Sequence, residues 1–307
     1  MAAPVVVLAG GTGGAKLARG MLDLVGENLV VVANTADDVE LYGAHVSPDP
    51  DLVTFRLAGL LDERGWGLEG DTFAVMDALR ALGTDVWFNL GDRDLAWCIE
   101  RRRLLDGGDT PTAAHAALAR AVGVAARILP MSDEPVRTRV LARGEWTGVQ
   151  EFLIRQQAEG PVDGVAFDGV AQARPTQQVL DVIAAARAIV IGPSNPVISI
   201  GPILELAGMR EAIAASPAPV VAVSPLVGGR VLKGPTAAFM AWAGLPLGAA
   251  GIARAYGGLL DGLLADENAG VAEPRVSLLD TLMADGQGCR RVAGAALELA
   301  EQVAGGR

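Results

Sequence analysis

The residues best suited to bind an anion form a glycine-rich turn near the start of the chain. Residues 10–14, GGTGG, follow a short apolar run at residues 5–8 and precede a segment with helical spacing at residues 15–24. Glycines let a ligand approach the backbone closely, and the N-terminus of the next helix directs its N–H groups at an anion. The pattern favours phosphate binding over the alternative, an ordinary tight strand-to-helix turn.

The turn fits neither of the two common phosphate-binding fingerprints. Counted from Gly11, the dinucleotide pattern G-x-G-x-x-G needs a glycine at Lys16. The Walker A pattern needs a glycine just before the lysine, where this chain has Ala15. Thr12, Gly13 and Lys16 still suit an anion, so we predict a phosphate-binding turn of neither common type.

A group of acidic residues follows the next apolar run, at residues 29–33. Asn34 and Thr35 come first, and four aspartates follow within fifteen positions: Asp37, Asp38, Asp49 and Asp51. Ligands of open parallel sheets bind beyond the carboxyl ends of the strands. Converging carboxylates repel one another unless a cation such as Mg²⁺, or the hydroxyls of a ligand, lies between them. The alternative is a solvated acidic loop whose side chains cap helices.

Two further polar groups follow apolar runs. Arg93 stands between two aspartates after residues 86–90, which fits either a ligand contact or a surface ion pair. Ser194 and Asn195 stand between two prolines after residues 188–191. Prolines fix the shape of a loop, so its donors suit a base edge or a phosphate, and the alternative is a rigid turn.

The elements that position these residues alternate along the chain. Expected strands are residues 5–8, 29–33, 86–90, 188–191 and 220–223, and expected helices are residues 15–24, 72–82, 95–105, 112–122, 177–186, 203–214 and 290–304. Alternating strands and helices predict an α/β fold with a Rossmann-like parallel sheet and helices on both faces. We expect residues 1–307 to form one domain. A smaller inserted subdomain with a hairpin is expected at about residues 130–170, because residues 137–142 alternate polar and apolar.

Composition narrows the class of protein. The 307 residues are 51% hydrophobic with a formal net charge of −11, which excludes intrinsic disorder and argues against nucleic-acid binding by charge. Two cysteines exclude a disulfide framework and favour a reducing, cytoplasmic location. Residues 234–253 carry no charge but contain two prolines, so we expect two buried helices joined by a turn rather than a membrane span.

The sequence resembles the 2-phospho-L-lactate transferase family of deazaflavin coenzyme F-420 biosynthesis. The resemblance runs from about residue 5 to about residue 265. It rests on eight segments in order: GGTGGAKL, NTADD, HVSPDPD, RGWGLEGDTF, LGDRD, ILPMSDEPV, GPSNPVISIGPIL and AVSPLVGG. Eight ordered segments are far more specific than one glycine turn.

The resemblance implies a reaction and a set of partners. Family enzymes transfer a phospho-acid from a guanosine diphosphate-linked donor to the terminal hydroxyl of the deazaflavin FO, use Mg²⁺ and release GMP. The phospho-acid is 2-phospholactate, phosphoenolpyruvate or 3-phosphoglycerate, and the choice stays open here. A homodimer is also implied. Such a reaction needs positioning and charge neutralisation more than covalent catalysis.

The resemblance also implies roles for individual residues. The expected nucleotide and substrate contacts are Gly11, Thr12, Gly13, Lys16, Asn34, Thr35, Ser194 and Asn195. The expected metal ligands are Asp37, Asp38 and Asp49, and the expected catalytic residues are Asp49, Asp51 and Arg93. Where family members commonly have S-P-D-L-D-T, this chain has a proline at position 50, between two of the aspartates.

Two other classes of protein remain as alternatives. One is a nucleotide-linked oxidoreductase with an atypical Rossmann turn, against which the missing third glycine counts. The other is a nucleotide-binding module without catalytic activity, against which the polar residues after several strands count.

Overall fold

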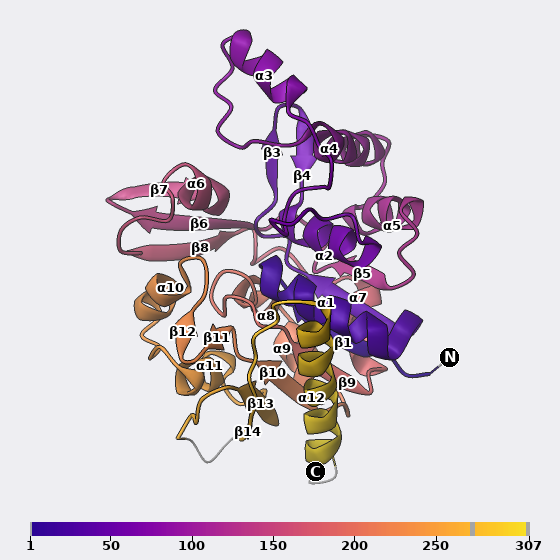
Figure 1. Ribbon diagram of the computed structural model, residues 1–307, viewed down its shortest axis with the longest axis vertical. Helices are drawn as coiled ribbons and strands as arrows, with labels where there is room; N and C mark the ends of the chain where they lie inside the picture. Colours follow the sequence, from indigo (N-terminus) through magenta and orange to yellow (C-terminus); the bar gives the residue numbers. More distant parts are fainter. Residues whose placement is uncertain (1, 271–273, 305–307) are drawn as a thin grey trace.

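A parallel sheet lies at the centre of the protein (Figure 1). The computed structural model describes residues 2–270 and 274–304, and within them seven strands pair in the order β14-β13-β10-β9-β1-β2-β5. These strands are β1 (Val5–Ala9), β2 (Leu29–Ala33), β5 (Arg127–Pro130), β9 (Ala188–Ile191), β10 (Val220–Val223), β13 (Gly262–Ala265) and β14 (Arg275–Leu278). Each neighbouring pair is parallel, which confirms the predicted fold class.

The strand order reverses beside β1. The chain passes from β1 through β2 to β5 on one side, and β9 then pairs with the other side of β1. Val5 lies opposite both Leu29 and Ala188, so the three strands are in register. A reversal of this kind leaves a crevice beyond the carboxyl ends of the two strands that flank it, and ligands bind there in open α/β sheets. The glycine turn after β1 and the loop after β9 border this crevice.

Both faces of the sheet are buried, and the side chains of each strand alternate between them. Val6 and Leu8 join one apolar core, whereas Val5 and Val7 join another on the opposite face. The first core includes α7 (Gln177–Ala184), α8 (Gly201–Glu205), α9 (Met209–Ala215) and α11 (Ala249–Tyr256). The second core includes α1 (Gly11–Val25), α2 (Pro48–Ala58) and α12 (Gly286–Ala304). Burying one such valine contributes about 1.5–3 kcal/mol, so both cores fix the strand ends that carry the site.

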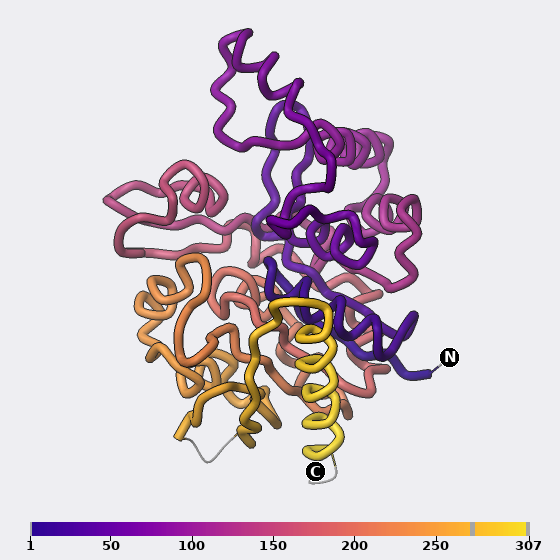
Figure 2. The backbone as a smooth tube through the Cα atoms, in the orientation of Figure 1, coloured from indigo at the N-terminus to yellow at the C-terminus, as the bar shows by residue number. Residues whose placement is uncertain are grey.

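Helices α1 and α12 lie side by side although they are far apart in the sequence (Figure 2). The two helices approach closely at Gly20, because a Cβ atom there would lie 2.1 Å from the carbonyl oxygen of Cys289. The helix expected at residues 290–304 is confirmed and begins four residues earlier, at Gly286.

The glycine turn is itself the first turn of α1. The helix begins at Gly11, not at residue 15 as the sequence pattern suggested. Gly13 packs against the loop after β9 so closely that a Cβ atom on it would lie 2.0 Å from the carbonyl oxygen of Pro193. Glycine is therefore needed here to bring the two borders of the crevice together.

We expect Gly13→Ala to lower the free energy of unfolding by about 1–3 kcal/mol, because the added methyl group must displace backbone. Urea denaturation followed by circular dichroism measures this change. Gly286→Ala is the matched control, since a Cβ atom at Gly286 meets nothing within 4 Å and alanine favours helix. A Gly13→Ala variant as stable as the wild type would contradict the close approach.

A lobe extends from the carboxyl edge of the sheet after β2 (Figure 1, top). Its elements are β3 (Val39–Leu41), β4 (Ala44–Val46), α3 (Ala74–Ala81) and α4 (Asp92–Asp106), and α5 (Pro111–Ala121) connects it to β5. The strand predicted at residues 86–90 is wrong, because this segment has no strand pairing. Its apolar residues instead pack into the core of the lobe: Val86, Phe88 and Leu90. Arg93 consequently does not lie at the edge of the central sheet.

An antiparallel sheet stands beside the lobe. It consists of β6 (Arg137–Ala142), β7 (Glu145–Gly148) and β8 (Gly164–Asp168), with α6 (Val149–Ile154) after β7. The expected hairpin is present at β6 and β7, and β8 pairs with the other edge of β6.

Two expectations about helices have opposite outcomes. Residues 234–253 form two short helices, α10 (Thr236–Trp242) and α11, as their prolines predicted. Within the described part of the chain, no helix has the length and apolar character needed to cross a membrane.

The single helix predicted at residues 203–214 is wrong, because the chain breaks between α8 and α9 at Gly208, whose φ is +91°. The remaining short elements are η1 (Gly26–Asn28), β11 (Leu226–Val227) and β12 (Arg230–Val231).

Candidate active site

Asp49 connects the glycine turn to the end of β2. It lies in the first turn of α2, after Pro48, and is buried. Its Oδ1 accepts a hydrogen bond from the Gly11 backbone N–H at 2.6 Å, and its Oδ2 accepts one from Asn34 Nδ2 at 2.9 Å. Burial raises the pKa of Asp49 to about 6. The two hydrogen bonds lower this pKa, and the charge of Asp38 raises it further. The other N–H groups in the first turn of α1 have no partner within the helix and are available to an anion.

Asp37 and Asp38 lie beside Asp49 and are also buried. Asp37 Oδ1 has no hydrogen-bond partner among the described residues. Burial is the main cause of a pKa of Asp37 well above the usual value, and the charges of Asp49 and Asp38 raise it further, whereas the nearby polar side chains of Asn34 and Thr138 lower it. A cation next to Asp37 would relieve both the burial and the repulsion.

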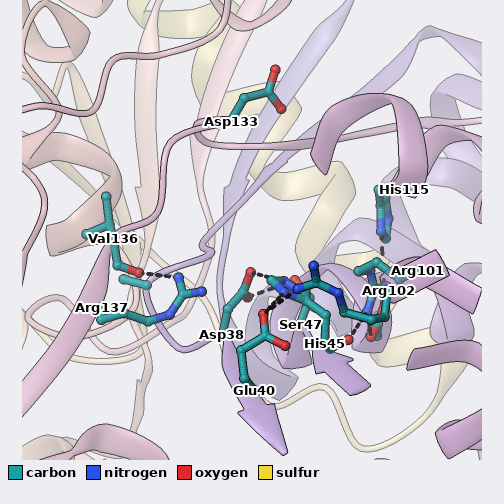
Figure 3. A network of polar contacts seen from close by, with 12 residues as sticks. Asp38, Glu40, His45, Ser47, Arg101, Arg102, His115, Asp133, Val136 and Arg137 are labelled. Carbon is teal, nitrogen blue, oxygen red and sulfur yellow. Dashed lines mark hydrogen bonds and ion pairs between the residues drawn. The ribbon is translucent and has the colours of Figure 1, made fainter. Parts of the chain in front are cut away.

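Asp38 belongs to a chain of polar contacts that leads to the surface (Figure 3). It accepts hydrogen bonds from Ser47 Oγ at 2.7 Å and from His45 Nε2 at 3.1 Å. The other ring nitrogen of His45 contacts Glu40 at 2.6 Å, and Glu40 lies 3.7 Å from Arg102. Burial lowers the pKa of His45, but hydrogen bonds and charges from Asp38 and Glu40 outweigh it, so the pKa is raised overall. His45 thus holds Asp38 in place.

Asp51 faces away from this group. It lies two positions after Asp49 in a helix, and such positions point in different directions. Its carboxylate accepts hydrogen bonds from both terminal nitrogens of Arg101, and from Trp97 Nε1 at 2.8 Å. The side chains of Asp51 and Arg101 are only 6% and 3% exposed. Residues 48–51 form the first turn of α2, so the proline at position 50 breaks no hydrogen bond within the helix.

The loop after β9 lies directly against the glycine turn, as its predicted place at a strand end implies. Ser194 Oγ donates to the Gly10 carbonyl oxygen at 2.5 Å and accepts from the Gly10 N–H at 3.2 Å. Asn195 Oδ1 accepts from the N–H groups of Val197 and Ile198. Both side chains shape the border of the crevice.

The side chains of four other predicted site residues form no hydrogen bond or ion pair with the predicted aspartates in the described part of the chain. Lys16 Nζ donates to the Met283 carbonyl oxygen at 2.8 Å, and Thr12 is exposed on the first turn of α1. Thr35 is buried, and its Oγ1 has no partner among the described residues. Arg93 is exposed at the start of α4 and donates to the Glu69 carbonyl oxygen at 2.7 Å. The roles predicted for these side chains stay predictions.

A cavity of about 170 Å³, here called the aromatic cavity, opens beside Asp51. Its aromatic lining is Phe55, Trp66, Phe73 and Phe88, and its carboxylates are Asp51, Asp71 and Asp94. Neither Asp71 nor Asp94 was predicted as a site residue, although they lie in the RGWGLEGDTF and LGDRD segments. Burial raises the pKa of Asp94 to about 7, helped by the charges of Asp51 and Asp71 and opposed by Arg101 and Cys98.

We expect Asp94→Asn to raise the melting temperature at pH 8, with a gain that shrinks towards pH 4. The pKa of Asp94 is raised in the folded state, from 3.8 to about 7, so its stabilising effect is fully present below about pH 4 and is lost as pH rises through about 7. Asparagine cannot ionise and avoids that loss. Thermal melts across this pH range test the expectation, with the exposed Asp109→Asn as control. A gain independent of pH would contradict it.

The residues present fit a magnesium ion that is shared with a substrate. Among residues 2–270 and 274–304, no three Asp, Glu, His or Cys side chains are grouped as a complete metal site. Mg²⁺ in phosphate-binding enzymes needs fewer protein ligands, because one or two carboxylates, waters and substrate oxygens complete its shell. Asp37 offers an unpartnered buried oxygen, and Asp49 is its buried neighbour.

These features define a class of protein. The protein is a Rossmann-like α/β protein, because the order of its parallel sheet reverses at a glycine turn. Buried carboxylates lie beside this turn and make the point of reversal a candidate phosphate site. Residues 5–285 match the model of the family described as 2-phospho-L-lactate transferase CofD, and the chain belongs to this family. It is accordingly a transferase, and the resemblance seen in the eight segments is confirmed.

Relatives match along nearly the whole chain. A protein of Streptomyces griseus named phosphoenolpyruvate transferase is 40% identical, covering 97% of this chain and 99% of the relative. A protein of Methanosarcina acetivorans named 2-phospho-L-lactate transferase is 37% identical, covering 94% and 96%. Among solved structures, a UPF0052 family member from Bacillus halodurans has a similar fold, with a TM-score of 0.60 at 16% identity over 97% of this chain and 99% of that one.

Proposed function

We propose that the protein transfers a phospho-acid from a guanosine diphosphate-linked donor to the terminal hydroxyl of FO and releases GMP, in coenzyme F-420 biosynthesis. The family match over residues 5–285 carries the proposal. The proposed phospho-acid is phosphoenolpyruvate. Relatives with that name in their title cover 96–97% of the chain, whereas those named for 2-phospho-L-lactate cover 86–94%.

The diphosphate of the donor would bind at the N-terminus of α1. The N–H groups of Thr12 and Gly13 lie in its first turn, and the helix dipole favours an anion there. The hydroxyl of Ser194 already bonds to Gly10, so Ser194 shapes this site rather than contacting the ligand with its side chain. Asn34 likewise is held by Asp49 and by the Ala36 N–H, and it fixes the direction of the Asp49 carboxylate.

Asp37 and Asp49 would hold Mg²⁺ beside the diphosphate. When bound, the ion would neutralise phosphate charge that develops as GMP leaves. The transition state of such a transfer is loose, so orientation of the hydroxyl and neutralisation of charge matter more than a covalent intermediate. Burial of the two carboxylates strengthens their attraction for the ion, because the surroundings screen it weakly.

The aromatic cavity suits the flat ring of a deazaflavin. Its lining includes Phe55, Phe88 and Trp66, and Trp66 is 57% exposed, so one ring is open to stacking. The guanidinium of Arg64 lies 4.4 Å from the Trp66 ring centroid and holds that ring in position. Asp94, with a pKa of about 7, offers a hydrogen-bond partner for a polar ring edge.

Calorimetric titrations with GDP, NAD⁺ and FO in the presence of Mg²⁺ test the proposal against its alternatives. We expect GDP and FO to bind and NAD⁺ not to bind detectably. Mass spectrometry of reactions with FO and each guanosine diphosphate-linked acid should detect GMP and the coupled product, with the enolpyruvyl donor at least about tenfold better in kcat/KM. NAD⁺ binding without an effect of guanine nucleotides would favour the oxidoreductase. GDP binding without any turnover would favour the binding module.

A further inference from the structure

A second cavity, here called the arginine cavity, is lined by Asp37 and Asp38, whereas the aromatic cavity is lined by Asp51. The volume of the arginine cavity is about 280 Å³. One wall is the segment from Ala36 to Glu40, and the other is formed by β6 and the start of α6. Its charged lining is Asp37, Asp38, Glu40, Arg137, Arg139 and Glu151, and Trp87 closes one side. The cavity thus adjoins the carboxylate to which we assign the metal.

Arg137 and Arg139 reach this cavity because they lie two positions apart on β6. Side chains of a strand alternate between its faces, and the intervening Thr138 is 2% exposed on the buried face. The guanidinium of Arg137 donates to the Val136 carbonyl oxygen at 2.7 Å and points toward Asp38 in Figure 3. It is half-buried, and no ion pair of the described residues includes it.

In the part of the chain that the structure describes, Arg137 has no ion pair although a carboxylate lies opposite it in the register of the sheet. Asp168 on β8 lies directly opposite Arg137, yet it pairs with Arg139 at 3.7 Å. Arg137 is therefore directed away from the carboxylate nearest to it in register and into the cavity.

The carboxylates of the cavity other than Asp37 already have partners. Asp38 is held by His45 and Ser47, and Glu40 by His45 and Arg102. Glu151 lies 3.4 Å from Arg155. Two groups remain uncompensated, namely the guanidinium of Arg137 and the buried Oδ1 of Asp37. A ligand that satisfies both carries an anionic group for the arginine and a phosphate that shares a cation with the aspartate.

We propose that the arginine cavity binds the carboxylate of the transferred phospho-acid, with Arg137 as its two-point partner and Arg139 beside it. This inference rests on the proposed function. In phosphoenolpyruvate the carboxylate stands on the carbon that bears the phosphate oxygen, so a carboxylate at Arg137 places the phosphorus toward Asp37. A planar guanidinium matches a carboxylate with two parallel hydrogen bonds, and a lysine does not. The cavity would thereby select donors that carry an acid over plain guanine nucleotides.

Binding and kinetics of Arg137→Gln and Arg137→Lys test the inference. Phosphoenolpyruvate, inorganic phosphate and GDP are titrated calorimetrically with Mg²⁺, and donor kinetics are measured with FO. We expect the wild type to bind phosphoenolpyruvate more tightly than inorganic phosphate. Both variants should lose at least about tenfold in phosphoenolpyruvate affinity and in donor kcat/KM, with GDP affinity within about twofold of the wild type. Arg120→Gln, an exposed position on α5, is the control for charge, and circular dichroism verifies the fold.

The outcomes separate this inference from the proposed function. Normal donor kinetics in both Arg137 variants would overturn the carboxylate site while the transferase activity stood. Equal wild-type affinity for phosphoenolpyruvate and inorganic phosphate would also overturn it, because the site would then recognise phosphate alone. A wild type without turnover, whose phosphoenolpyruvate binding still depended on Arg137, would support the carboxylate site and refute the proposed reaction.

Discussion

Replacing Arg101 with methionine is expected to lower the free energy of unfolding by about 3–5 kcal/mol. Arg101 is buried and donates to both oxygens of Asp51 and, at 3.1 Å, to the His45 carbonyl oxygen. Without it, the Asp51 carboxylate stays buried and unpaired. Chemical denaturation measures the loss.

The double variant Asp51→Asn with Arg101→Met is the informative control. It removes both charges, keeps a side-chain oxygen for the Trp97 indole N–H, and should recover most of the lost stability. If Asp51 only positions α2 against α4, turnover per folded enzyme should recover as well. If Asp51 acts directly on the substrate, as the sequence analysis predicted, stability should recover without turnover. A double variant as unstable as Arg101→Met would show that the ion pair is not the origin of the loss.

The parts of the site that the sequence located lie beside strands of the central sheet. The glycine turn, Asn34 and Ser194 follow β1, β2 and β9, and the apolar runs of these strands were recognisable because both of their faces are buried. Parallel pairing then brings the carboxyl ends together, which hydrogen bonds between Asp49, Gly11 and Asn34 confirm. For these residues the pattern of the sequence was sufficient.

The lobe after β2 was not predictable in the same way. Residues 86–90 are apolar because they pack into the lobe and line its cavity, and such a run cannot be told from a buried strand by its composition. Because a strand was predicted at residues 86–90, Arg93 was wrongly expected at the edge of the central sheet. Asp94 was not recognised as a site residue, because its raised pKa depends on its burial in the tertiary structure around α4. Likewise, only the structure shows that Asp49 and Asp51 face opposite ways.

Replacing Asp37 with asparagine is expected to lower kcat/KM by about 100-fold or more at limiting Mg²⁺, which corresponds to about 2.7 kcal/mol. The side chain has almost the same shape, so the change removes a charge and a metal ligand and leaves the packing intact. The same variant should be more stable than the wild type at pH 8, because burial and the neighbouring carboxylates raise the pKa of Asp37 and so penalise its charged form. Loss of activity together with a gain in stability is typical of a functional residue.

The metal dependence of stability separates a ligand from a residue that only shapes the fold. A ligand that binds the folded state alone raises the melting temperature, so Mg²⁺ with GDP should stabilise the wild type and have much less effect on Asp37→Asn. Asp163→Asn is the matched control, because Asp163 is exposed in the segment before β8 and the same charge is lost. Thermal melts with and without Mg²⁺ and GDP, next to kinetics over a range of Mg²⁺, provide both readouts. If Asp37→Asn kept the wild-type activity and the wild-type response to Mg²⁺, the metal would have to bind elsewhere, and the unpartnered oxygen of Asp37 would need another explanation.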